Sequence, residues 1–110
     1  MPIITIRSID AGKKLDLQKI RSEISEKTGI DSLRLQLMAE YYPSEDFLTS
    51  GAYSFIHIAA ADNNGKELIQ ELMKACVSAV AAQFEVEPSR ISAFSHPIGA
   101  GYLMVKNQFI

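Results

Sequence analysis

Several features that would assign the chain to a common class are absent from its 110 residues. There is a single cysteine, Cys76, so an internal disulfide framework is excluded and a reducing compartment is favoured. The 11 Lys and Arg residues are scattered and the formal net charge is −2, so the composition gives nucleic-acid binding no electrostatic support. The apolar runs are short and broken by charge, and no basic segment followed by an apolar one opens the chain. We expect a cytoplasmic protein that binds neither nucleic acid nor a membrane, with export without a leader left open.

The residues that are present describe an ordinary globular protein. Hydrophobic residues make up 47% of the chain and charged residues 22%. This length predicts a single domain over residues 1–110. A domain of this size buries only enough surface to fold alone, so association between copies would stabilise it.

The first part of the chain alternates between strand and helix patterns. Residues 2–7 are mostly β-branched and predict a strand. An apolar stripe at spacings of three and four predicts a helix over residues 15–28, with Gly29 as its stop. Alternating leucines then predict a second strand over residues 33–42, in which Arg34 points away from the leucine face.

The second part, about 53–96, repeats the order of the first, about 2–42. Asn64 and Glu67 match a capping box at the start of its helix, with Asn in place of Ser or Thr. The predicted elements are a strand over 53–60, a helix over 65–84, a strand over 91–95 that His96-Pro97 ends, and a short strand over 102–105 in the C-terminal tail.

The two parts also resemble each other in sequence. Residues 10–20 align with residues 63–73, which places Ile3 opposite Ile56. A duplicated β-α-β unit predicts an α+β two-layer fold, with one four-stranded mixed sheet and both helices on one face. Strand residues on both faces are apolar, so we expect the second face to be covered by assembly.

This element order is shared by ferredoxin-like regulatory domains, dimeric α+β barrels and tautomerases, and the N-terminus favours one of them. The start "MPIITIR", the segment "DSLRLQLMAE" at 31–40 and the segment "EVEPSRISAFS" at 85–95 resemble the tautomerase superfamily. That superfamily includes 4-oxalocrotonate tautomerase and macrophage migration inhibitory factor. The length is similar to its fused two-repeat branch, and the resemblance implies a homotrimer.

Pro2 is the predicted catalytic group, because methionine is usually removed before a small residue and Pro2 then carries a free secondary amine. Free α-amino groups have reference pKa values of about 7.7–8.0, and an apolar pocket or nearby cations lower the pKa further. A neutral amine can take a proton from a carbon beside a carbonyl and return it elsewhere. The competing interpretation is that Pro2 serves only in N-terminal processing.

Arg34 and Lys13 are the predicted substrate-binding cations. Arg34 matches the second-strand arginine of 4-oxalocrotonate tautomerase, and a guanidinium can hold a substrate carboxylate bidentately. Lys13 lies near the place where the short tautomerases carry a substrate-binding arginine, shifted by one position. A solvated or interface role is the alternative for both residues.

Phe94 is the predicted apolar pocket wall, with core or trimer packing as its alternative. The resemblance also shows departures from the migration-inhibitory-factor branch. Ile30 stands where that branch has a lysine, and Ser92 and Phe94 stand where it has an aromatic and an amide pocket residue.

Together these residues predict a tautomerase or isomerase that needs no cofactor and acts on a small 2-oxo or unsaturated carboxylic acid. In related reactions the same proline acts as a cationic acid, and the residues leave that choice open. Two alternatives are a binding or signalling protein of the same fold without catalysis, and a ferredoxin-like small-molecule sensor or assembly module. His57, His96 and Cys76 are expected to serve packing and show no metal-ligand spacing. Tyr41 and Tyr42 are expected at the surface or an interface, with a hydrogen bond to a substrate oxygen as the alternative.

Overall fold

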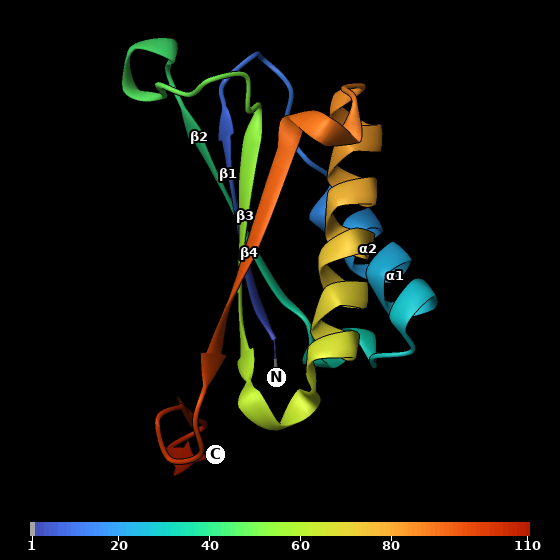
Figure 1. The fold of residues 1–110 in the computed structure, drawn as a ribbon, viewed down its shortest axis with the longest axis vertical. Coiled ribbons are helices and arrows are strands. Elements are labelled where there is room, and N and C mark those ends of the chain that lie inside the picture. Colours follow the sequence, from blue (N-terminus) through green and yellow to red (C-terminus); the bar gives the residue numbers. More distant parts are fainter. Residues whose placement is uncertain (1) are drawn as a thin grey trace.

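The computed structural model describes residues 2–110, which form two layers (Figure 1). One layer is a four-stranded sheet in the order β2-β1-β3-β4, and the other consists of helices α1 and α2, both on the same face of the sheet. This confirms the α+β two-layer fold with a mixed sheet and two helices on one face. The strands and helices, in chain order, are β1 Ile3–Ile9, α1 Leu17–Thr28, β2 Gln36–Tyr42, β3 Ser54–Ala61, α2 Lys66–Phe84, β4 Ile91–Ile98, β5 Met104–Val105 and β6 Gln108–Phe109.

The two central strands run antiparallel, and each has a parallel partner from its own half of the chain. In β1, Ile6 lies between Ala39 of β2 and Ile56 of β3. Strand β3 pairs in parallel with β4, with Ser54 beside Ile91 at the start of that pairing. The sheet is therefore built from two β-α-β units that meet at the β1–β3 pair.

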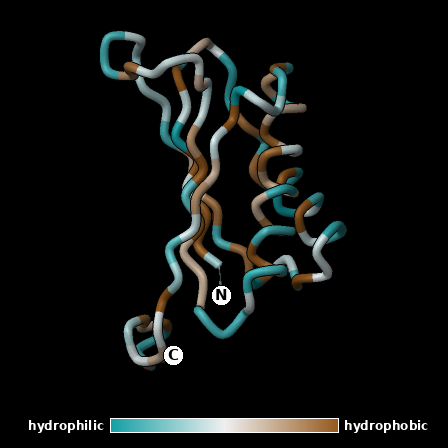
Figure 2. Tube along the Cα trace, viewed as in Figure 1, coloured by the Kyte–Doolittle hydropathy of each residue, from teal (hydrophilic) through white to brown (hydrophobic). Residues whose placement is uncertain are grey.

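The helix-covered face of the sheet forms the hydrophobic core. Alternate residues of β1 and β3 point toward the helices, and Figure 2 shows the apolar segments concentrated where strands and helices face one another. Loss of apolar surface from water is the main force that holds the two layers together. The fully buried side chains of the strands and helices include Ile4, Ile6, Ile56, Ile58, Ile20, Ile24, Leu72, Val80 and Cys76.

Helix α1 begins two residues later than the sequence pattern indicates. The carboxylate of Asp16 accepts a hydrogen bond from the backbone N–H of Lys19, so Asp16 is the N-cap and Leu15 lies outside the helix. The predicted stop at Gly29 is confirmed, because Gly29 adopts a left-handed conformation with φ of 77°.

The predicted capping box at helix α2 is wrong. The N-cap residue is Gly65, and no side chain caps the helix. The Asn64 side chain instead donates a hydrogen bond from Nδ2 to the carbonyl oxygen of Ala61, at 2.8 Å. A short 3-10 helix over Asp62–Asn64 directs the Asn64 side chain back toward the end of β3.

Strand β4 continues through His96 and Pro97, although the sequence pattern ends it at residue 95. Because β4 is an edge strand, Pro97 can occupy a position where no ladder hydrogen bond is required of its nitrogen. The C-terminal tail forms a small two-stranded hairpin of β5 and β6 in place of one terminal strand.

The internal repeat is real, but the alignment of its strands shifts by one residue. Ile56 is fully buried against the helices, whereas Ile3 lies on the opposite face of the sheet. The strand pairings and burial pattern place Ile4 as the counterpart of Ile56, because a shift of one residue reverses the face of every side chain.

Candidate functional site

Pro2 and Arg34 line the same small cavity, at the end of the molecule where β1 begins. The cavity has a volume of about 50 Å³, enough for a few water molecules. Pro2 is buried, whereas Arg34 is exposed at the surface. The two residues most strongly indicated by the sequence are therefore brought together within one chain.

Backbone hydrogen bonds fix both residues. The carbonyl oxygen of Pro2 accepts a hydrogen bond from the N–H of Gln36 at 3.1 Å, which ties the start of β1 to the start of β2. Arg34 ends a 3-10 helix over Ser32–Arg34, and its N–H donates to the carbonyl oxygen of Asp31 at 2.9 Å.

The predicted strand position of Arg34 is wrong, because β2 begins only at Gln36. The Asp31 carboxylate accepts a hydrogen bond from the N–H of Leu33 at 3.0 Å, which stabilises the turn, and Leu33 remains 72% exposed. This turn, and not strand alternation, places Arg34 beside Pro2.

The remaining walls of the cavity are mainly apolar and come from the first two turns of α2 and from Ile30, just after the C-cap of α1. The polar exception is Asn64, which sequence reasoning assigned only to helix capping. Asn64 reaches the cavity because the β3–α2 connection lies beside the start of β1 (Figure 1), a proximity that the sequence pattern does not report. Together with Pro2 and Arg34, the lining residues are Ile30, Asn64, Leu68, Ile69 and Leu72.

Lys13 lies at the opposite end of the sheet from Pro2, because β1 separates them. Its Nζ pairs with Glu85 at 3.1 Å, just after the C-terminal end of α2. The cavity at Pro2 is lined instead by residues from the start of α2. Within one chain the structure does not bring Lys13 to Pro2.

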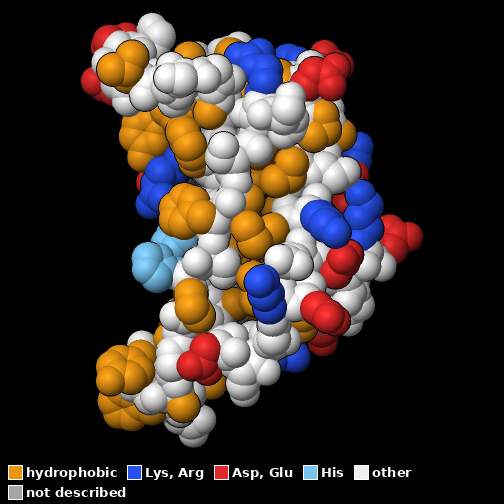
Figure 3. Space-filling model, in the orientation of Figure 1, with side chains coloured by type: hydrophobic (Ala, Val, Ile, Leu, Met, Phe, Trp, Pro, Cys, Tyr) orange, Lys and Arg blue, Asp and Glu red, His pale blue; other side chains and the backbone are white. Residues whose placement is uncertain are grey.

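Phe94 lies on the other face of the sheet, away from the helices. Its ring stacks on the ring of His57 with centroids 4.7 Å apart, and His57 in turn meets the edge of His96 at 5.4 Å. Phe94 is 46% exposed, and Figure 3 shows the histidine side chains projecting from this open face. Phe94 therefore walls no part of the Pro2 cavity of its own chain.

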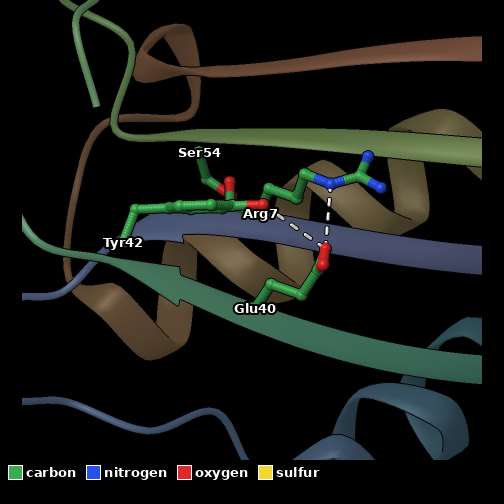
Figure 4. A network of polar contacts seen from close by, with 4 residues as sticks. All are labelled: Arg7, Glu40, Tyr42 and Ser54. Atoms are coloured by element: carbon green, nitrogen blue, oxygen red, sulfur yellow. Dashed lines mark hydrogen bonds and ion pairs between the residues drawn. The ribbon is translucent and has the colours of Figure 1, made fainter. Parts of the chain in front are cut away.

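The open face also carries a polar cluster, shown in Figure 4. Nε of Arg7 donates to Glu40 at 3.0 Å, and the hydroxyl of Tyr42 lies 3.5 Å from the same carboxylate. From the helix-covered side, where its side chain is fully buried, Ser54 donates to the carbonyl oxygen of Arg7 at 3.1 Å. These contacts link β1, β2 and β3 at the end of the sheet far from Pro2. Tyr41, on the helix side, accepts a hydrogen bond from the N–H of Leu15.

A larger cavity of about 380 Å³ lies between α2 and strands β3 and β4. Its charged lining residues are Asp62 and Lys66, and its walls are largely apolar, with Met73 and Pro97 among them. A third cavity, along the outer side of α2, has the same volume of about 380 Å³, but neither of the two larger cavities is lined by Pro2 or by an arginine. The smaller cavity is the better candidate because its chemistry is more specific.

Three further observations concern metal-ligating groups, the reactivity of Cys76 and the length of the helices. Residues 2–110 contain no group of three or more His, Cys, Asp or Glu side chains arranged to hold a metal ion. Cys76 is fully buried, and burial raises the pKa of its thiol to about 12, which keeps it protonated and unreactive. Among the same residues, no helix has the length and apolarity needed to span a membrane.

The sequence matches no protein-family model and no curated protein. Solved structures do match it over almost its whole length. A fused 4-OT in an asymmetric trimer superposes with a TM-score of 0.84 at 9% identity, covering 97% of this chain and 94% of that one. A member of the cis-3-chloroacrylic acid dehalogenase family gives 0.78 at 12% identity, covering 98% and 82%.

Macrophage migration inhibitory factor from Toxoplasma gondii gives a TM-score of 0.76 at 12% identity, covering 98% of this chain and 99% of that one. At such low identities the likeness establishes the fold. The chain has the fold of the tautomerase superfamily, as the segment "MPIITIR" and the repeated element order predict.

Proposed function

We propose that this chain, with its tautomerase-superfamily fold, is a tautomerase or isomerase in which the free amine of Pro2 moves a proton on a small 2-oxo or unsaturated carboxylic acid. The observation that carries the proposal is the shared cavity of Pro2 and Arg34. Removal of Met1, which lies outside the described residues, is part of the proposal.

The two residues would divide the chemistry between them. The Pro2 nitrogen takes a proton from the carbon next to the substrate carbonyl, and the electron pair moves into an enolate. Arg34 is exposed at the mouth of the cavity, where its guanidinium can hold the substrate carboxylate. Apolar neighbours such as Leu68 and Leu72 favour the neutral, proton-accepting form of the amine.

The size of the cavity supports assembly as part of the site. About 50 Å³ is too little for a carboxylic acid of several carbons, so the substrate must extend past the wall of one chain. We propose a homotrimer, in which a neighbouring chain supplies the missing wall. The trimeric fused 4-OT structures that match this chain support that assembly. In such an assembly Lys13 and Phe94 belong to surfaces that a neighbouring chain can use.

The test is a tautomerase assay of the wild type and Pro2→Ala with phenylpyruvate and 2-hydroxymuconate, after intact-mass analysis has established whether Met1 is removed. We expect Met1 to be absent and Pro2→Ala to lose about 10²–10⁴-fold in kcat. Retained Met1, or equal activity of the two proteins, would refute Pro2 as the base. Light scattering tests the trimer, and a monomer would contradict it.

A single buried cysteine is compatible with a reducing environment, and we propose that the protein acts in the cytoplasm. Fractionation of the native cell tests this directly.

A further inference from the structure

Asn64 is the polar group of the Pro2 cavity that the proposed proton transfer leaves without a role. We propose that its side-chain amide donates a hydrogen bond to the substrate oxygen on which negative charge develops, and so selects acids whose carbonyl lies next to the carboxylate. This inference rests on the proposed function of Pro2 and names the substrate class of the same site.

The orientation of the Asn64 amide follows from its hydrogen bond. The acceptor at 2.8 Å is the carbonyl oxygen of Ala61, and only the Nδ2 end of an amide can donate to a carbonyl. One N–H of Nδ2 is engaged there, and the second N–H makes no hydrogen bond within residues 2–110. The side chain is partly buried and lines the cavity, so a fixed donor remains beside Pro2.

Three polar groups from separate parts of the chain then meet around one cavity. Pro2 comes from the start of β1, Arg34 from the turn before β2, and Asn64 from the turn before α2. The rest of the lining is apolar, and hydrogen bonds to a developing charge are strongest where water is excluded. A planar 2-oxo acid presents a carboxylate and a carbonyl oxygen on adjacent carbons, which matches one cation and one neutral donor.

The step balances without a further reactant. The C3–H bond of the 2-oxo acid breaks and its proton moves to the Pro2 nitrogen. The electron pair forms the C2–C3 double bond, and the carbonyl π electrons move to the oxygen. Asn64 stabilises that oxygen until the proton returns from Pro2 to it, which gives the enol and the neutral amine. A neutral amide suits this role because it gives up no proton of its own.

The first experiment compares Asn64→Leu with the matched control Asn63→Leu. Both residues belong to the 3-10 helix Asp62–Asn64, but Asn63 is exposed and does not line the Pro2 cavity. We expect Asn64→Leu to lose about 10- to 100-fold in kcat on a 2-oxo acid with little change in KM, since the donor acts mainly on the transition state. The control keeps wild-type kcat.

A purely structural role of Asn64 predicts a different pattern. Loss of the hydrogen bond to Ala61 alone would lower the melting temperature and leave the kcat of the folded protein unchanged. That result, together with a large loss in Pro2→Ala, would overturn the inference and leave the proposed function standing. Asn64→Asp should raise KM instead, because its carboxylate repels the substrate carboxylate.

A second measurement does not depend on turnover. The side-chain amide resonance of Asn64 in ¹⁵N-labelled protein, assigned by its absence in Asn64→Leu, is followed while pyruvate is added. We expect it to shift while the Asn63 side-chain resonance stays fixed. An unmoved Asn64 resonance overturns the inference, whether or not the wild type is active. A wild type without tautomerase activity, by contrast, contradicts only the proposed role of Pro2.

Discussion

The two β-α-β halves share the same order of elements, but the arginine that precedes the second strand of each half has different surroundings. Arg34 and Arg90 each end a 3-10 helix that leads into a parallel strand, β2 after Leu35 in the first half and β4 at once in the second. Arg34 lines the cavity beside Pro2. Arg90 instead donates from Nε to the carbonyl oxygen of Gly51 at 3.2 Å and lies over the ring of Tyr53.

The difference comes from what stands next to each arginine. The strand pairings make Ser54 the counterpart of Pro2. Ser54 is fully buried and forms hydrogen bonds with the hydroxyl of Ser8 and the carbonyl oxygen of Arg7. The connection from β2 into β3 supplies the Gly51 carbonyl oxygen that Arg90 binds at the surface, so that half has structural contacts where the first half has a cavity. A repeated fold therefore supplies two equivalent places, and local sequence decides which of them is open for chemistry.

The largest effect should be the same in both halves. Ile6 and Ile56 are cross-strand partners at the centre of the sheet and are both fully buried. We expect Ile6→Ala and Ile56→Ala each to lower the free energy of unfolding by about 3 kcal/mol, because each leaves a cavity in close-packed core. Urea denaturation measures both. A difference larger than about 2 kcal/mol would show that the two halves do not share the core equally.

The next largest effect is a loss of activity that we expect from the arginine of the first half alone. Arg34→Ala removes the proposed carboxylate ligand, and we expect kcat/KM to fall about 10- to 100-fold, as loss of a charged hydrogen bond implies. Arg90→Ala should keep wild-type activity and lose about 1 kcal/mol of stability. Steady-state kinetics and urea denaturation of both variants give the result. Equal activity losses would contradict the assignment of the site to the first half.

A smaller effect concerns Cys76, which is fully buried in helix α2. Burial raises the Cys76 pKa from 9.0 to about 12, so above pH 9 the thiol ionises in the unfolded chain before it does in the folded one. The unfolded state then binds fewer protons, and stability falls as pH rises, until the folded thiol also ionises near pH 12. Between pH 8 and 10 the wild type should lose about 1.4 kcal/mol more than Cys76→Ala.

Urea denaturation at both pH values checks this prediction, with Cys76→Ala as the matched control. A parallel pH dependence of the two proteins would mean that the thiol is not held in its neutral form.

The smallest effect lies on the open face of the sheet. The ion pair of Arg7 and Glu40 belongs to the first half, and the equivalent positions of the second half carry Ala59 and His96. Both charged side chains are about two-fifths exposed, at 41% and 43%. Glu40→Gln should therefore change the free energy of unfolding by no more than about 0.5 kcal/mol in dilute protein, where solvent screens the pair. A much larger loss at higher protein concentration would place this face in a contact between copies.

Particular elements show how far sequence reasoning reaches. β-branched runs, one period-two pattern and the period-3.6 stripes predict the four long strands and the two helices of the described residues, because strand geometry and core burial favour those patterns. Their ends are less certain: Asp16 moves the start of α1, and Asp31 replaces the first residues of a predicted strand with a turn. Short polar side chains that bond to nearby backbone compete with the periodic pattern, and hydropathy does not report them.

The sequence by itself determined the two-layer fold, the repeat and the burial of Cys76, and it identified Pro2 and Arg34 as candidate site residues. Only the tertiary structure decided that Asn64 joins these two residues, that Lys13 binds Glu85 at the far end of the sheet, and that Phe94 faces away from the cavity. The physical reason is that periodicity fixes which face a side chain occupies within its own element. Proximity between elements depends on strand order and register, which arise only when the whole core packs.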